Sequence, residues 1–169
     1  MKTPPPGLVE ALGLKAVDRA GWLRVGLERP ESVAAHSWGV AWLALALCPE
    51  HLDLRRVLAL AVLHDLPEVR VGDLTPHDGV DKVEKRRRER AAAEALFASR
   101  PDLLALWQEY EDHVTPEARF VHALDRLDMG LQAGLYARQG VNTAEFVESA
   151  LRGLPDELRA LLEATGSAT

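Results

Sequence analysis

Four side chains in this sequence have the types and the spacing of a metal centre. His36 lies within one apolar helical pattern, the adjacent pair His64 and Asp65 ends a second, and Asp125 interrupts a third. A carboxylate on a helix face that is otherwise built to pack is costly unless it is paired or bound to a metal. Two imidazoles and two carboxylates form a mixed nitrogen and oxygen set, which suits Mn, Fe, Co, Ni or Zn better than an ion held by oxygen alone.

Each of these residues also has an ordinary structural alternative. A lone histidine on an apolar helix is most often a hydrogen-bonded core residue, and Asp125 could form a buried salt bridge with Arg126 or a distant lysine. The spacing favours the metal centre, because 27 residues separate His36 from His64 and Asp125 follows much later. Three different helices would then converge on one ion.

The rest of the sequence predicts a helical frame. Aromatic residues make up only 5% of the 169 positions while Ala, Leu and Glu abound, which favours helices over strands. We expect a single all-α domain over 1–169, a bundle of about eight to nine helices without a sheet, with a metal-binding core over about 14–138 and C-terminal helices over 143–164. The expected helices span 8–17, 32–48, 54–65, 80–99, 101–111, 115–138, 143–151 and 155–164, and an ordered loop is expected over 18–31.

Capping residues and prolines predict where these helices begin and end. Ser32, Asp53 and Thr115 are suited to accept hydrogen bonds from the first free amides of the helices that follow them. Pro67 disfavours helical geometry at the residue before it, so the second core helix should end directly after its histidine–aspartate pair. Two of the potential ligands are therefore expected at the boundary of an element.

Charge and composition limit the class of partner. A formal net charge of −6 argues against broad binding of nucleic acid polymers or anionic membranes, although one local cluster of cations can still hold a phosphate. No apolar run approaches the roughly 18 residues of a membrane span. The first residues lack the apolar core of a signal peptide, so we expect a cytoplasmic protein. Cys48 is the only cysteine and is expected to be a small buried hydrophobe.

The four potential ligands match the H…HD…D signature of the HD superfamily, and their surroundings resemble its YfbR-like 5′-deoxynucleotidase branch. The shared stretches span about two-thirds of the chain in order. They lie at 19–22 (R-x-GW), 30–36 (PESV-x-x-H), 64–73 (HD-x-x-E-x-x-x-GD), 82–89 (K-x-EK-x-RRE), 106–111 (LW-x-EYE) and 120–133 (F-V-x-x-LD, ending in LQA).

The resemblance implies a hydrolase that cleaves deoxynucleoside 5′-monophosphates to a deoxynucleoside and phosphate. It also implies one divalent ion (Co, Mn, Fe, Ni, Zn or Mg) and a homodimer. An HD phosphohydrolase acting on a nucleoside triphosphate or guanosine tetraphosphate is the nearest alternative, and a non-catalytic nucleotide-binding protein is another. The implied metal ligands are His36, His64, Asp65 and Asp125.

The resemblance further implies roles for residues beside the ligands. Glu68 is the implied acid or base, and Asp73 is the second implied catalytic residue. Trp22 would crowd the sugar and so disfavour a 2′-hydroxyl, and Arg19 would orient the phosphate. Read from the residues alone, Trp22 is a loop aromatic in the core and Asp73 an N-cap or Asx-turn residue. The implied substrate-binding set is Arg19, Trp22, Asp65, Asp73, Leu74, Thr75, Pro76 and Asp125.

Two positions depart from the family pattern. Gly21 stands where the bacterial branch has an arginine directly before the tryptophan, whereas Arg19 lies three residues before it, as in the eukaryotic-like branch. Ala35 stands where relatives have an acid before the first ligand, which predicts the loss of a partner for that ligand. The basic run 82–90 either neutralises a phosphate or forms a solvated, salt-bridged helix face, and His122 is expected on the surface.

Overall fold

The computed structural model describes residues 7–166, and over that range it contains nine α-helices, one 3₁₀ helix and no β-strand. This confirms the expected all-α fold. The Pro4–Pro6 opening and residues 167–169 lie outside the described residues. In chain order the elements are η1 (Glu10–Ala16), α1 (Ala20–Arg24), α2 (Val33–Leu47), α3 (Leu54–Leu63), α4 (Glu68–Val71), α5 (Lys82–Leu96), α6 (Pro101–Glu111), α7 (Pro116–Ala137), α8 (Ala144–Gly153) and α9 (Asp156–Gly166).

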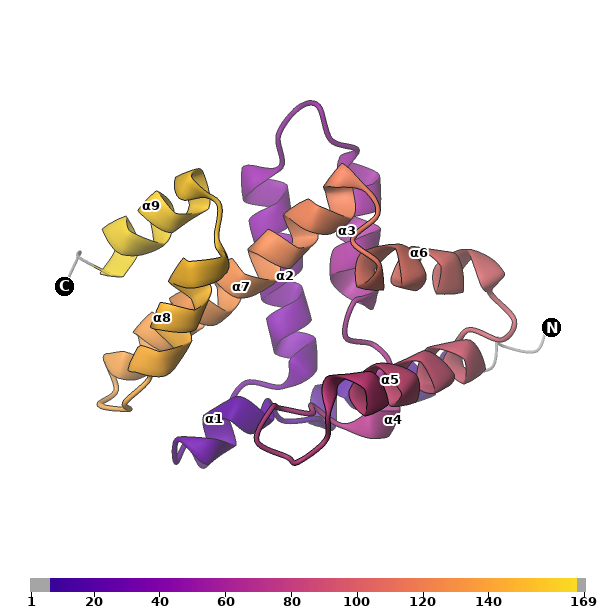
Figure 1. The fold of residues 1–169 in the computed structure, drawn as a ribbon, viewed down its shortest axis with the longest axis horizontal. Coiled ribbons are helices and arrows are strands. Elements are labelled where there is room, and N and C mark those ends of the chain that lie inside the picture. Colours follow the sequence, from indigo (N-terminus) through magenta and orange to yellow (C-terminus); the bar gives the residue numbers. More distant parts are fainter. Residues whose placement is uncertain (1–6, 167–169) are drawn as a thin grey trace.

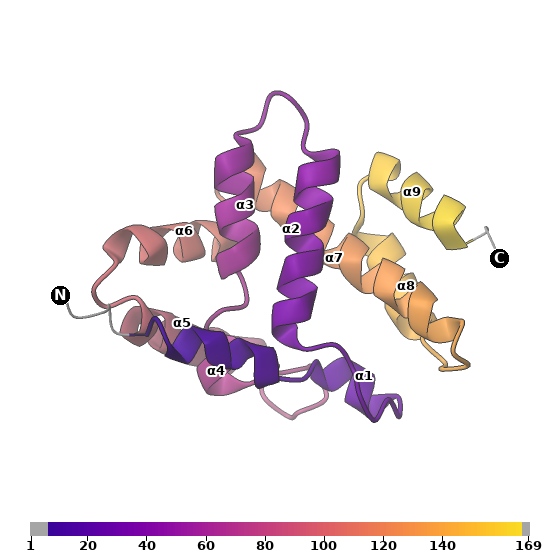
Figure 2. The same cartoon turned by 180° about the vertical axis from the view of Figure 1, so that it is seen from behind.

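Three helices form the centre of the molecule. α2 and α3 lie side by side and antiparallel, and the long helix α7 crosses them (Figures 1 and 2). α8 and α9 pack on α7 toward one end and α6 contacts it at the other, while α5 lies beside α4 and contacts α6 (Figure 1). The described part of the chain has no helix that joins the length and the apolar character of a membrane span.

Local chemistry explains where the central helices begin. The Ser32 hydroxyl accepts from the amide of Ala35 at 3.2 Å, and the Asp53 carboxylate accepts from the amide of Arg55 at 2.9 Å. Thr115 accepts from Ala118 at 3.1 Å and is followed by a proline, which has no amide to satisfy. These caps confirm the three predicted helix starts and fix where each helix presents its ligand residue.

The main core lies between α2, α3 and α7. Apolar side chains from these helices bury one another and receive α8 and α9 on the far side of α7. Cys48 packs against this core but is half-buried rather than buried, because it lies at the end of α2. The fully or nearly fully buried members are Val40, Leu43, Ala44, Val57, Leu60, Ala61, Tyr110, Ala118, Val121, Ala123, Leu124, Leu127, Ala150, Leu154 and Leu162.

Two expectations at the N-terminal side were wrong in detail. The segment 8–17 contains a 3₁₀ helix rather than an α-helix, and the expected loop 18–31 contains the short helix α1. The start of α1 is stabilised from a distance, because Oδ2 of Asp73 accepts from the amide of Ala20 at 2.8 Å. A helix that depends on a carboxylate 53 residues away leaves no signal in the local sequence.

Candidate functional site

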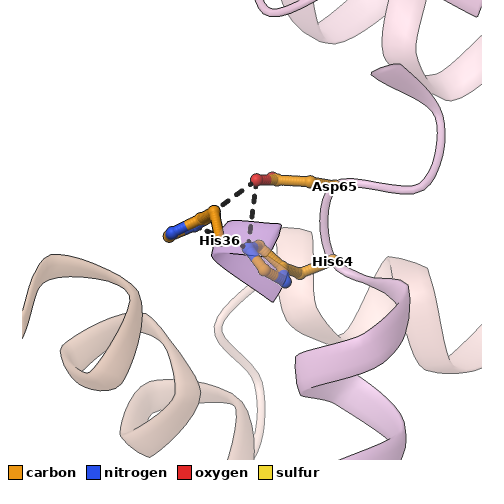
Figure 3. Close-up of side chains that lie close together, drawn as sticks. All are labelled: His36, His64 and Asp65. Atoms are coloured by element: carbon orange, nitrogen blue, oxygen red, sulfur yellow. Dashed lines mark hydrogen bonds and ion pairs between the residues drawn. The ribbon is translucent and has the colours of Figure 1, made fainter. Parts of the chain in front are cut away.

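Three of the four side chains meet at one point, since potential ligand atoms of His36, His64 and Asp65 all lie within 4.8 Å of one another, and Asp125 joins them through its contact with His36. Nε2 of His36 lies 3.4 Å from Nε2 of His64 and 3.1 Å from Oδ1 of Asp125. Oδ2 of Asp65 lies 3.1 Å from Nε2 of His64 and 3.6 Å from Nε2 of His36. Figure 3 shows His36, His64 and Asp65 directed toward one another. Ligands bound about 2.1 Å from one ion lie roughly 3 Å apart, so these spacings are compatible with a shared cation.

Each of the four is held by a central element. His36 lies on the buried face of α2, and Asp125 lies on α7 where that helix crosses α2. His64 and Asp65 directly follow α3, where the chain turns before Pro67. Arg126, the salt-bridge partner considered for Asp125, lies against Gly153 instead.

Both imidazoles have their outer nitrogen already in use. Nδ1 of His36 donates to Oδ2 of Asp128 at 2.7 Å, and Nδ1 of His64 donates to the carbonyl of Ala61 at 2.8 Å. A carbonyl or an ionised carboxylate only accepts, so each Nδ1 carries a proton, and each imidazole in its neutral form presents its Nε2 lone pair to the cluster. A histidine that binds a metal through one nitrogen characteristically donates its other N–H in this way.

The electrostatics of the cluster favour a cation at its centre. Burial disfavours a charged imidazole, yet hydrogen bonds to the carboxylates of Asp125 and Asp128 raise the pKa of His36 to about 10. Burial would raise the pKa of Asp65, but His64 and His36 hold it at about 2. The carboxylates thus favour a positive charge beside His36, which a second ring proton supplies without metal and a bound cation would supply in its place. Two imidazole nitrogens and two carboxylates therefore fit a divalent ion both in donor type and in charge.

Glu68 lies on the first turn of α4, one turn beyond the ligand pair. Its side chain is buried, and its Oε2 has no hydrogen-bond partner among the described residues. Burial raises the pKa of Glu68 well above the usual range, and the nearby carboxylates of Asp65 and Asp73 raise it further. These surroundings therefore favour the protonated form of the carboxyl group, which makes the expected role of acid chemically possible.

A cavity of about 300 Å³ lies beside the cluster on the side of Arg19. Nη1 of Arg19 is 3.7 Å from Oδ2 of Asp65, so its guanidinium borders both the cluster and the cavity. Burial opposes the charge of Arg19, but Asp65 and Asp73 outweigh it and raise its pKa. The lining residues are Arg19, Gly21, Trp22, Arg24, Asp73, Leu74, Thr75, Pro76, His77, Met129, Glu145, Phe146 and Ser149.

Trp22 lies at the buried side of this cavity and is only 1% exposed. Its Nε1 donates to Oε1 of Glu31 at 2.9 Å, and its ring packs against Tyr136 and Phe146, with centroids 5.2 and 4.3 Å away. The indole is thus mostly packed in the core, and only a small part of it faces the cavity. Asp73, also expected to touch substrate, uses one oxygen to hold the start of α1.

A second cavity of about 640 Å³ opens onto the ligand cluster itself, because His64, Asp65 and Asp125 line it together with Glu68. Its cations come from α5, where Lys85 donates to the carbonyl of Leu74 at 2.7 Å and lies 3.5 Å from Glu89. The basic run 82–90 therefore presents its side chains on two different faces of α5. Its cavity side consists of Lys82, Lys85 and Arg86, whereas Arg87 and Arg88 pair with Glu84 on the exposed face.

Sequence reasoning misplaced His122 and missed Asp128. His122 is half-buried rather than on the surface, since its ring stacks on Tyr110 with centroids 3.8 Å apart. Asp128 follows Asp125 by three residues on α7, a spacing that places both on one helix face and that could have identified it. Ala35 lies exposed on α2, and His36 has a carboxylate partner without an acid at that position.

Comparison with known proteins finds relatives that share this fold. A family model described as HD domain matches residues 11–162. The chain is similar to a bovine (Bos taurus) protein named 5′-deoxynucleotidase HDDC2, with 42% identity over 128 residues. That match covers 73% of this chain and 62% of the bovine protein, so it spans about three-fifths of its relative's length.

Two solved structures share the fold at higher coverage. The PH0347 protein from Pyrococcus horikoshii OT3 superposes with a TM-score of 0.83 and 33% identity, over 95% of this chain and 96% of that one. A protein from Magnetospirillum magnetotacticum MS-1, described as a predicted metal-dependent phosphohydrolase, has a TM-score of 0.72 and 34% identity, over 94% and 87%. These similarities extend over nearly the whole length of this chain.

Proposed function

Because this chain belongs to the HD domain family, we propose that it is a metal-dependent 5′-deoxynucleotidase that hydrolyses deoxynucleoside 5′-monophosphates to a deoxynucleoside and phosphate. The observation that carries the proposal is the convergence of His36, His64 and Asp65, whose potential ligand atoms all lie within 4.8 Å of one another, with Asp125 3.1 Å from Nε2 of His36 and both Nδ1 atoms bonded away from the cluster. The similarity to a bovine 5′-deoxynucleotidase supports the choice of substrate.

In this proposal His36, His64, Asp65 and Asp125 hold one divalent ion, with Co, Mn, Fe, Ni, Zn and Mg as the candidates. Such an ion polarises a phosphoryl oxygen and lowers the pKa of a water molecule. The donor set favours a transition metal, since imidazole nitrogen suits Zn, Fe, Ni and Co better than Mg.

The chain's own residues then bind the phosphate and supply a proton. Arg19 orients the phosphate, because its guanidinium borders both the cluster and the smaller cavity. As a water oxygen bonds to phosphorus and the bond to O5′ breaks, Glu68 donates the proton of its buried carboxyl group to O5′, and the proton released by the water restores it. Asp65 and Asp125 face the same phosphate from the ligand cluster.

The nucleoside occupies the smaller cavity. Asp73 fixes the segment that carries Arg19, and the following residues Leu74, Thr75 and Pro76 form one wall of the cavity. Trp22 limits the space beside the sugar, because Tyr136 and Phe146 prevent its ring from moving away. In this proposal the wall leaves no space for the 2′-hydroxyl of a ribose, so a deoxyribose is preferred.

The test is a substrate panel. Protein stripped of metal and reloaded with Mn or Co is assayed for phosphate release from dAMP, dCMP, dGMP, dTMP, AMP, dATP and guanosine tetraphosphate. Release from the deoxynucleoside monophosphates, lost without metal, is the expected result. Cleavage of dATP or guanosine tetraphosphate alone would assign a different substrate, and nucleotide binding without turnover would identify a non-catalytic protein.

The proposal includes a homodimer and a cytoplasmic location, the latter because the substrates belong to intracellular nucleotide metabolism. α2 presents Trp38, Trp42 and Leu45 outward at helical spacing, and the two tryptophans are 70% and 56% exposed. Ala35 extends this apolar stripe. In a symmetric dimer this stripe would pack against the same stripe of the second subunit and bury all of these residues, as in isologous interfaces.

Sedimentation measures the oligomeric state. The variant with both Trp38→Glu and Trp42→Glu is expected to sediment with half the mass of the native protein. Val114→Glu, at an exposed apolar residue outside the stripe, is the matched control and should leave the mass unchanged.

A further inference from the structure

The imidazole of His36 is held from behind by a residue of another helix. Its Nδ1 donates to Oδ2 of Asp128 at 2.7 Å, and the Asp128 side chain, on α7, is only 14% exposed. His64 differs, because its Nδ1 donates to Ala61, which lies three residues earlier along its own chain. The orientation of His64 is therefore set locally, whereas that of His36 depends on how α2 and α7 pack.

A glycine on α2 makes this packing possible. Gly39 is buried, lies three residues after His36, and thus shares its helix face. A methyl group at position 39 would lie 2.9 Å from Cγ of Asp128 and closer still to Oδ1. No side chain therefore fits between α2 and the Asp128 carboxylate, so Gly39 provides the space into which that carboxylate enters.

The partner of His36 does not come from a neighbouring residue in the sequence. Position 35, directly before His36, holds an alanine on the exposed face of α2. The carboxylate that contacts the His36 ring from outside the ligand cluster comes instead from α7, three residues after Asp125. Asp125 and Asp128 thus approach the two nitrogens of one imidazole from a single helix face.

We propose that Asp128 is a positioning residue for metal binding and that Gly39 is the residue that admits it. The hydrogen bond keeps the proton on Nδ1, fixes the ring plane and leaves the Nε2 lone pair directed into the site. This inference rests on the proposed metal site, but it concerns the affinity of that site and not the substrate.

The measurement is the affinity of the metal-free protein for Co²⁺, by calorimetry and by the visible absorption of bound cobalt. Asp128→Ala is expected to bind Co²⁺ about 10- to 100-fold more weakly than the native protein. Asp128→Asn, whose amide oxygen can still accept from Nδ1, is expected to lose less. Because a purely structural role would respond to stability alone, the unfolding of each metal-free variant is measured in parallel.

Gly39→Ala is expected to weaken Co²⁺ binding as Asp128→Ala does, because it displaces the same carboxylate. The double variant should bind no worse than Asp128→Ala alone, since both changes remove one interaction. Gly134→Ala is the matched control, because Gly134 lies on α7 with open space around its Cα, and it should leave the affinity unchanged.

The outcomes separate this inference from the proposed function. Native affinity in Asp128→Ala, or additive losses in the double variant, would overturn the positioning role and leave the metal site standing. A native protein that binds no Co²⁺ would overturn both. Should Gly39→Ala fail to fold, the comparison of Asp128→Ala with Asp128→Asn decides alone.

Discussion

The ligand cluster and the smaller cavity lie next to each other but are built in different ways. The cluster is assembled from α2, the end of α3 and the middle of α7, and its two histidines are buried. The cavity is lined by the five-residue helix α1, the loop after α4 and one face of α8, with several exposed side chains at its rim. Arg19 is the residue that contacts both regions.

The difference separates reaction chemistry from substrate choice. Side chains on long, capped helices keep their relative positions, which a shared metal ion requires within a few tenths of an ångström. Loops and short helices tolerate change, so they suit the part of a site that selects one substrate over another. We therefore expect substitutions in the cluster to abolish turnover and substitutions in the cavity to alter selectivity.

The largest effect is expected from Asp125→Ala. Loss of a proposed ligand should reduce phosphate release from dAMP by more than the roughly 100-fold that loss of a ligand's outer partner can cost. Elemental analysis should show less bound metal in the same preparation. Full activity would remove Asp125 from the site and leave the cluster without its contribution from α7.

Glu68→Gln should reduce kcat by about 10²- to 10⁴-fold, the usual contribution of a general acid or base. The amide has the shape of the protonated carboxyl, so folding and metal content should be retained. Glu89→Gln is the matched control, because Glu89 borders the second cavity near Lys85 and burial raises its pKa to about 7. Equal losses in both variants would contradict a specific role for Glu68.

In the cavity, Trp22→Ala should reduce the preference for dAMP over AMP, measured as the ratio of their kcat/KM values, by up to about 100-fold, the scale on which an apolar wall rejects one hydroxyl. The same change should lower the free energy of unfolding by about 3–5 kcal/mol, because the indole is buried. Trp22→Phe preserves more of the packing and serves as the folded comparison. An unchanged ratio in both variants would leave Trp22 with a packing role only.

The smallest effect is expected at the rim. Glu145 pairs with Arg24 at an exposed edge of the cavity, and exposed pairs contribute about 0.2–1 kcal/mol. Glu145→Gln should therefore change KM for dAMP by no more than about fivefold and leave kcat unchanged. A large loss of kcat would show that the rim takes part in the chemistry and would weaken the division between the two regions.

Much of this arrangement could be predicted without the structure. Apolar residues at helical spacing, capping side chains and prolines act over a few residues. For this reason α2, α3, α6 and α7 begin and end close to where they were expected. The candidate ligands could also be predicted, because a histidine or carboxylate on an otherwise apolar helix face is costly unless it is paired or bound to a metal. The short helix α1 could not, since the interaction from Asp73 crosses 53 residues.

The sequence by itself determined where the longer helices lie, the capped starts of three of them and the four side chains able to bind a cation. Only the tertiary structure decided that Asp128 reaches His36 through the space left by Gly39, and that Glu68 is buried with one oxygen unpaired. Helix periodicity is a property of neighbouring residues. The distance between two helices depends on all the side chains packed between them, and no local pattern records it.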